Sequence, residues 1–99
     1  MRVIAASTLK SFWEQPEHQD AEQALKAWHE EATKAIWQQP SDIKAHYRNA
    51  SILKNRRVVF NIKGNDFRLV TRINYEFKLV WIRFIGTHEE YDKIDATKI

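Results

Sequence analysis

The sequence predicts a two-layer α+β domain, residues 1–99, in which helices cover one face of an antiparallel meander. Three observations predict this fold class. A chain of 99 residues has room for one small core. Apolar residues recur at helical spacing in its first half and alternate with polar residues in its second half. Helices that precede a run of hairpin strands indicate the order β-α-α-β-β-β-α and a sheet with one open face.

The first half of the chain supplies one strand and two helices. Residues 1–6 are rich in apolar side chains, which is typical of a strand. Residues 7–14 form a short helix, for which Ser7 is the expected N-cap. A longer helix begins at a cap on Asp20 and runs to about residue 38, because its Ala, Leu, Trp and Ile side chains share one face.

The second half changes to a period of two. Residues 41–47 can add one or two helical turns before this change. Residues 57–63, 67–74 and 78–85 then alternate and are rich in Val, Ile, Phe and Trp, which predicts three antiparallel strands. Residues 63–66, Lys-Gly-Asn-Asp, predict a tight turn between the first two strands, because Gly and Asn accept positive φ angles.

Charge is distributed unevenly along the chain. The formal net charge is +3, but residues 43–85 carry ten Lys or Arg against two Asp or Glu, a balance of +8. The blocks before and after are acidic, at −3 and −2. Such a polarised molecule favours a polyanionic partner, most often nucleic acid. The alternative is that the charges only solvate the surface.

Alternation along the strands predicts which sheet face is basic. The apolar face packs on the helices, and we expect Val80, Ile82 and Phe84 to lie on it in the last strand. The open face can hold an extended single strand of RNA, because Arg binds phosphate and Trp stacks on bases. The alternative is that arginine stems only shield the sheet. The residues expected on this face are Arg57, Asn61, Lys63, Arg68, Arg72, Trp81 and Arg83.

The C-terminal segment carries side chains that can move protons. Thr87 is the expected cap of a short helix, and Glu90 completes its capping box. On that helix His88, Tyr91 and Asp92 share one face. His titrates near neutrality, Asp can orient it, and the Tyr hydroxyl can donate or accept a proton. An inert, exposed His is the alternative.

Several other chemistries are excluded by composition. No Cys is present, so disulfides and thiolate catalysis are excluded, and the four His residues show no metal-ligand spacing. Two glycines cannot form a phosphate-binding glycine loop. The sequence predicts no transmembrane segment and no signal peptide, and the lack of Cys suits a reducing cytoplasm. We therefore expect no metal, no organic cofactor and no membrane partner.

Two motifs resemble a known family. Residues 60–70, Phe-Asn-Ile-Lys-Gly-Asn-Asp-Phe-Arg-Leu-Val, are similar to the Phe-Asn-Ile-x-x-Asn-x-(apolar)-Arg-(apolar)-(apolar) signature of HigB-type toxins. Residues 87–92, Thr-His-Glu-Glu-Tyr-Asp, resemble the segment that closes those sequences. The likeness covers nearly the whole chain. It implies a RelE-like fold and a bacterial, cytoplasmic toxin of a type II toxin–antitoxin system.

The resemblance also implies an activity and partners. Such toxins are cofactor-free endoribonucleases, or mRNA interferases, which generally cleave mRNA in the ribosomal A site. The implied partner is a HigA-like antitoxin with a helix-turn-helix domain, and operator DNA is expected to be bound only through the toxin–antitoxin complex. Arg83 is similar in placement to an arginine that acts at the scissile phosphate. The residues that match the two motifs are Asn61, Asn65, Arg68, His88, Tyr91 and Asp92.

The expected reaction is attack of an RNA 2′-hydroxyl on the adjacent phosphate, without a metal. Arginines stabilise the transition-state charge, while His88 acts as base or acid with Tyr91 in the complementary role. RelE uses two closely spaced lysines, whereas Lys54 and Lys63 are nine residues apart, so the general base stays open. A non-catalytic RNA- or ribosome-binding module and a protein-interaction domain are the alternatives. The expected catalytic residues are Arg68, Arg83, His88, Tyr91 and Asp92, and the expected RNA-binding residues are Arg57, Asn61, Lys63, Asn65, Arg72 and Trp81.

Overall fold

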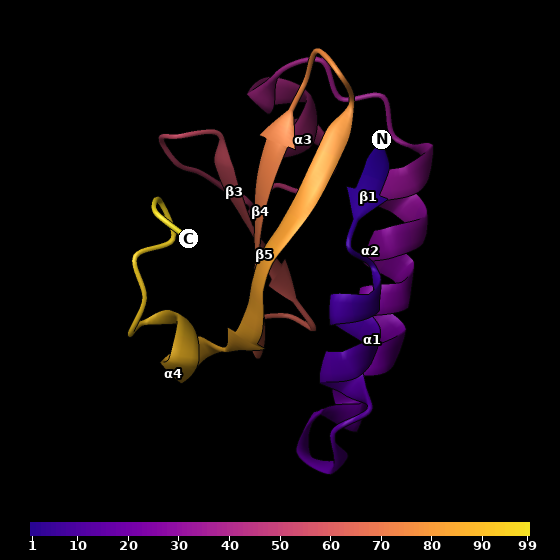
Figure 1. Ribbon diagram of the computed structural model, residues 1–99, viewed down its shortest axis with the longest axis vertical. Coiled ribbons are helices and arrows are strands. Elements are labelled where there is room, and N and C mark those ends of the chain that lie inside the picture. Colours follow the sequence, from indigo (N-terminus) through magenta and orange to yellow (C-terminus); the bar gives the residue numbers. More distant parts are fainter.

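A five-stranded sheet forms the centre of the structure, a computed structural model that describes residues 1–99 (Figure 1). Its spatial order is β1-β5-β4-β3-β2. Three of the strands form the predicted antiparallel meander, and β1 adds to its edge parallel to β5. The strands are β1 (Arg2–Ile4), β2 (Ser51–Ile52), β3 (Arg57–Ile62), β4 (Phe67–Asn74) and β5 (Leu79–Thr87).

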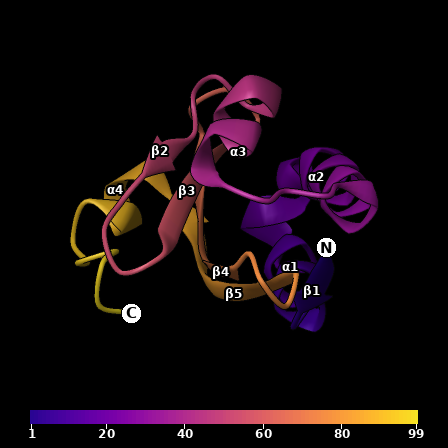
Figure 2. The same ribbon diagram turned by 90° about the horizontal axis from the view of Figure 1, so that it is seen from above.

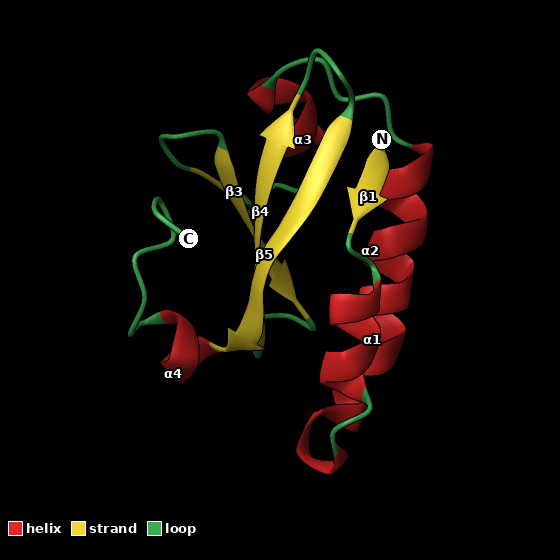
Figure 3. Cartoon of the chain, in the orientation of Figure 1, coloured by secondary structure: helices red, strands yellow, loops and turns green.

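Helices cover one side of this sheet, as the sequence predicts (Figures 2 and 3). The last short helix lies on the opposite side, next to the end of β5 (Figure 1). None of the helices combines the length and the apolar composition that crossing a membrane requires. The helices are α1 (Ser7–Trp13), the 3₁₀ helix η1 (Pro16–Ala21), α2 (Glu22–Lys34), α3 (Pro40–His46) and α4 (His88–Tyr91).

The predicted boundaries of the first helices are partly wrong. Ser7 is the first helical residue of α1 and makes no capping hydrogen bond. Asp20 falls inside η1 rather than at the start of α2, and its carboxylate accepts a hydrogen bond from Lys63 Nζ at 2.7 Å. α2 ends at Lys34 because the chain then becomes extended and buries Trp37, which is 3% exposed. Tertiary contacts thus override local helix signals at both ends.

The predicted apolar face of the sheet packs on the helices and forms the main core. Trp28 of α2 meets Phe60 of β3 edge to face, with ring centroids 5.3 Å apart. Trp37 stacks on the same Phe60 ring at 6.0 Å. The other buried sheet residues of this core are Val58, Ile62, Phe67, Leu69, Ile73 and Val80. This packing holds the opposite face of β3, β4 and β5 toward the side on which α4 lies.

A β-bulge in β5 changes which side chains share that opposite face. The ladder with β4 shifts between Val70 and Thr71, and Arg83 is left without a paired residue. One extra residue reverses the alternation of the strand beyond it. Phe84 therefore packs with Val59 and Val70, away from the helices. The prediction that Phe84 lies on the helix-facing side is wrong for this reason.

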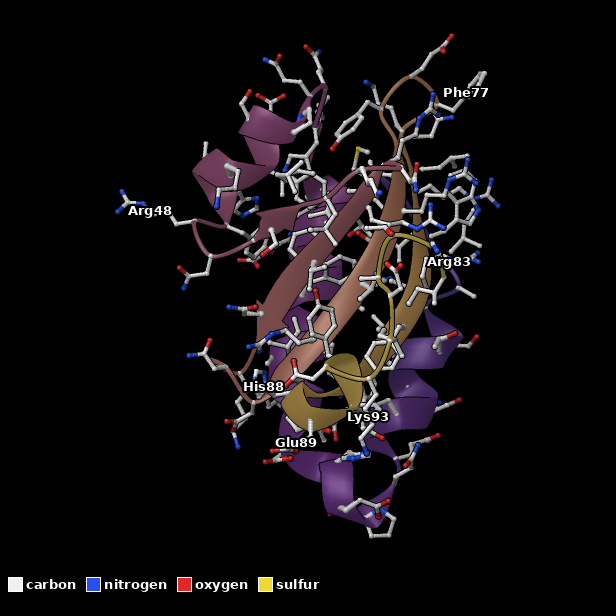
Figure 4. The ribbon with its side chains drawn as sticks, turned by 90° about the vertical axis from the view of Figure 1, so that its left-hand side faces the viewer. Arg48, Phe77, Arg83, His88, Glu89 and Lys93 are labelled. Atoms are coloured by element: carbon white, nitrogen blue, oxygen red, sulfur yellow. The ribbon has the colours of Figure 1, made fainter.

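The C-terminal residues cross the face that the sequence predicts to be open. Residues 92–99 follow α4 and return along the sheet (Figure 4). Arg57 Nε donates a hydrogen bond to the main-chain oxygen of Ile99 at 2.9 Å, and Asn55 Nδ2 donates to the carbonyl oxygen of Thr97 at 3.0 Å. A second, small core lies beneath this segment, so the middle of the face is covered. We call it the tail core; it contains Leu53, Val59, Val70, Phe84, Tyr91, Ile94, Ala96 and Ile99.

Gly86 lies where β5 approaches α4, and we expect Gly86→Ala to destabilise the protein. A Cβ atom there would stand 2.5 Å from Phe84 Cζ and 3.0 Å from Glu90 Oε1. Overpacking of this kind costs about 1–3 kcal/mol in the free energy of unfolding. Urea denaturation measures it, with Ser51→Ala on an exposed strand position as the control. An unchanged midpoint would contradict the close packing at this point.

Candidate active site

The short helix α4 is built by the capping box that the sequence predicts. Thr87 Oγ1 accepts a hydrogen bond from the backbone N–H of Glu90 at 3.2 Å, and the backbone N–H of Thr87 donates to Glu90 Oε1 at 2.8 Å. The second bond lowers the pKa of Glu90, because it favours the ionised carboxylate. Two orphan backbone donors are thereby satisfied, and His88 is fixed at the start of the helix.

Arg68 and His88 meet although they are twenty residues apart. Arg68 Nη2 lies 3.1 Å from His88 Nδ1. A guanidinium can only donate, so Nδ1 is the acceptor and the proton of the neutral ring is on Nε2. Nε2 faces Asp92 Oδ2 at 3.5 Å. Arg68, His88 and Asp92 thus form one continuous polar chain.

The position of the Arg68 side chain is itself fixed by the neighbouring turn. Its Nη1 donates to the carbonyl oxygens of Asn65 at 2.9 Å and Phe67 at 3.3 Å. His88 and Asp92 remain 52% and 58% exposed, so a large substrate can reach them. The predicted clustering of His88 with Asp92 is found. Tyr91 lies on the same helix, but its ring packs against the tail core.

Asn61 and Asn65 lie beside the polar chain of Arg68, His88 and Asp92, whereas the Lys63 amine pairs with carboxylates outside it. Asn61 Nδ2 donates to Asn65 Oδ1 at 3.2 Å. Lys63 Nζ lies 2.7 Å from Asp20 and 3.7 Å from Asp66. The predicted turn is present, and its positive φ angles are at Lys63, 52°, and Gly64, 63°. The hydrogen bond to Asp20 raises the pKa of Lys63, which makes this amine a poor general base.

A cleft beside His88 contains a residue that the sequence does not single out. The cleft has a volume of about 610 Å³ and lies between η1, the β3–β4 turn and α4. His18 of η1 lines it, stacked on Phe12 with centroids 4.1 Å apart. No sequence signal reports this placement, because η1 approaches α4 only in the folded protein. No group of three His, Cys, Asp or Glu side chains is arranged to hold a metal ion.

A second basic group lies at the other end of the same sheet face. Arg57 of β3 is directly opposite Arg72 of β4, and Arg72 lies over the ring of Trp81 at 5.5 Å. Burial, and then the charges of Arg72 and Arg83, lower the pKa of Arg57. We call Arg57, Arg72, Arg83 and Trp81 the arginine cluster. The bulge places Arg83 here and not beside Arg68 and His88.

The tail core separates the two groups. The strand registers give three successive rows across β3, β4 and β5, and the middle row is apolar. In Figure 4 the C-terminal tail, in yellow, runs between the labelled Arg83 and His88. The rows are Arg57–Arg72–Trp81, Val59–Val70–Phe84 and Asn61–Arg68–Gly86. The single basic face that the sequence predicts is therefore two sites.

Removing the cap of α4 is expected to destabilise the protein and weaken the site. Thr87→Ala deletes the Oγ1 acceptor, and loss of such a cap costs about 1 kcal/mol. Thr87→Ser retains a hydroxyl and is the matched control. Thermal denaturation measures the stability of both variants, and NMR of the His88 ring measures its environment. Equal behaviour of the two variants would contradict a structural role for this hydrogen bond.

Comparisons with known proteins identify the family of this chain. Residues 21–94 match the family model of the HigB toxin, the RelE-like toxic component of a toxin–antitoxin system. The chain is 30% identical to the mRNA interferase toxin HigB of Escherichia coli K12, covering 97% of this chain and 92% of that protein. The mRNA interferases HigB of E. coli O157:H7 and Shigella flexneri match to the same extent. The predicted resemblance and the RelE-like fold are thus confirmed, and this chain belongs to the HigB family of RelE-like toxins of toxin–antitoxin systems.

Proposed function

We propose that this toxin is an endoribonuclease that cleaves mRNA and so inhibits translation and growth. The observation that carries the proposal is the continuous chain Arg68–His88–Asp92, which joins a phosphate-binding cation to a proton acceptor and its orienting carboxylate. The mRNA interferases to which this chain is similar support the same activity. An exposed site on a sheet face also suits a polymeric substrate.

The chemistry follows from the contacts of Arg68 and His88. The guanidinium is held by backbone carbonyls and is directed toward His88. A bound scissile phosphate draws this guanidinium toward its own oxygens, because a charged acceptor is stronger than a neutral ring nitrogen. Nδ1 of His88 is then free to accept the proton of the RNA 2′-hydroxyl, and Asp92 stabilises the resulting imidazolium at Nε2.

The oxygen of the 2′-hydroxyl attacks the adjacent phosphorus, and the bond to the 5′-oxygen of the next nucleotide breaks. The products are a 2′,3′-cyclic phosphate and a free 5′-hydroxyl. Arg68 stabilises the charge of the pentacoordinate transition state. Tyr91 is our proposed donor of the proton to the leaving 5′-oxygen, since it follows His88 by one helical turn. No metal or organic cofactor is required for these steps.

The remaining site residues are proposed to hold the RNA. The paired amides of Asn61 and Asn65 lie next to Arg68 and can bind a base or sugar edge. Lys63 adds positive charge at the turn, although two carboxylates partly neutralise it. Trp81 can stack a base. Arg57 and Arg72, with Arg83, supply the further basic surface.

We further propose the cellular setting of this activity. Cleavage takes place in the bacterial cytoplasm, on mRNA in the ribosomal A site. A HigA-like helix-turn-helix antitoxin neutralises the toxin, and operator DNA is bound only through the toxin–antitoxin complex. Family membership and the likeness to HigB support this setting.

Induced expression in bacteria tests the proposed function. We expect growth arrest, with new 5′ ends in mRNA that primer extension maps, and cleavage of mRNA on ribosomes by the purified toxin. Translation arrest without new 5′ ends would contradict the nuclease and favour an RNA- or ribosome-binding module. Binding to an acidic protein, with neither effect on the cell, would favour a protein-interaction domain.

A further inference from the structure

We propose that the arginine cluster is a second RNA site, which binds phosphates of the same strand several nucleotides away from the scissile bond. This inference rests on the proposed function, because the strand that it binds is the one presented to His88. It differs from the sequence-based expectation of one continuous RNA face, and it assigns Arg83 to RNA binding and not to the reaction centre. The structural basis is the division of the face by the tail core.

The arginine cluster carries an excess of positive charge. Arg72 and Arg83 are exposed and lie in no ion pair with a carboxylate. Burial, and then the charges of Arg72 and Arg83, lower the pKa of Arg57. An excess of like charge held in one place stabilises a bound polyanion and disfavours the empty site. Phosphodiester groups are the matching ligand, because arginine binds them through paired donors.

The cluster is also preorganised. Arg57 Nε donates to the main-chain oxygen of Ile99 at 2.9 Å, and Nη1 donates to the carbonyl oxygen of Asn55 at 2.8 Å. Nη2 also donates to the main-chain oxygen of Ile99. Arg57 therefore supplies charge from a fixed position, and Arg72 and Arg83 keep their donors for a ligand. Arg72 lies over Trp81 at 5.5 Å, which restricts its guanidinium. A single strand suits this flat surface better than a duplex, which needs an element that enters a groove.

The spacing of the two sites gives the length of RNA involved. Arg68 and Arg72 lie four residues apart on β4, so their Cα atoms are about 13 Å apart. A stacked strand advances about 3.4 Å along its axis for each nucleotide, so about four stacked nucleotides cover this distance. The strand must also pass over the tail core. An RNA of about three nucleotides centred on Arg68 therefore does not reach the cluster, whereas one of about twelve does.

The test measures binding of non-cleavable 2′-O-methyl RNA, so its outcome does not depend on nuclease activity. The double variant Arg72→Ala/Arg83→Ala is compared with the native toxin, using single-stranded probes of about three and about twelve nucleotides. Lys10→Ala, which removes an exposed charge on the helical side of the sheet, is the control. Circular dichroism confirms that each variant is folded.

We expect the double variant to bind the long probe about tenfold or more weakly and the short probe with unchanged affinity. The slope of log K against log salt for the long probe should fall by about 1.4, since two phosphate contacts are lost. Unchanged affinity for the long probe, or an equal loss for both probes, would overturn the proposal.

Discussion

Arg68→Ala is expected to abolish growth inhibition and to lower the rate of mRNA cleavage by at least about 10²–10³-fold, the usual cost of losing one transition-state donor. The side chain has two tasks, because Nη2 contacts His88 Nδ1 and Nη1 is held by the carbonyls of Asn65 and Phe67. Its loss removes the phosphate ligand and the neighbour that orients His88. RNA affinity should fall together with the rate.

Arg68→Lys is the matched control for this prediction. Lysine keeps the positive charge but cannot present the planar pair of donors, so it should recover binding more than cleavage. Single-turnover cleavage on ribosomes separates the two effects. Full toxicity of Arg68→Ala in a folded protein would contradict the assignment of Arg68 to the reaction centre.

His88→Ala is expected to lower the cleavage rate by about 10²–10⁴-fold, the usual contribution of a positioned acid or base, while RNA affinity stays within a few-fold. His88 is 52% exposed and lies at the first position of α4, so its removal leaves no cavity in either core. The loss should therefore appear in the rate of the bound complex and not in binding. Growth assays and single-turnover kinetics measure it.

Two comparisons make the His88 prediction sharper. Asp92→Asn should have a smaller effect on the rate, since the amide retains an oxygen near Nε2 but no charge to stabilise the imidazolium. The double variant Arg68→Ala/His88→Ala should lose little more than the worse single variant, because the two side chains act as one unit. Additive losses, or a fully toxic His88→Ala, would contradict this mechanism.

Much of the site was predictable because its parts are local. The capping box of α4 depends on residues three apart, and both its hydrogen bonds are present. In β3 and the first part of β4, alternation alone determines which side chains lie on the helix-facing side of the sheet. Val58, Phe60 and Leu69 are buried there as predicted. The meeting of Arg68 with His88 could be anticipated only through the family motifs. Composition and spacing give no sign of it.

The errors at Phe84, Arg83 and Asp20 share a physical origin, because these positions depend on pairing between different segments of the chain. The bulge opposite Val70 reverses the alternation of β5, so Phe84 and Arg83 could not be placed from the pattern of that strand. Asp20 reads as a helix cap but pairs with Lys63, on a turn that the chain forms much later. In each case a long-range contact outweighs a local preference worth about 1 kcal/mol or less.

By itself the sequence determined the α+β class, the helix-covered meander, the capped C-terminal helix and the excess of basic residues in residues 43–85. Hydrophobic periodicity and capping chemistry act within a few residues, and these features need nothing more. Only the tertiary structure decided how the basic residues are divided. The return of residues 92–99 buries Val59, Val70 and Phe84 beneath the tail, and this burial separates the arginine cluster from Arg68 and His88. Both faces of the sheet carry apolar side chains, and burying them is favourable. The helices cover one face, and the C-terminal segment covers the apolar side chains on the other.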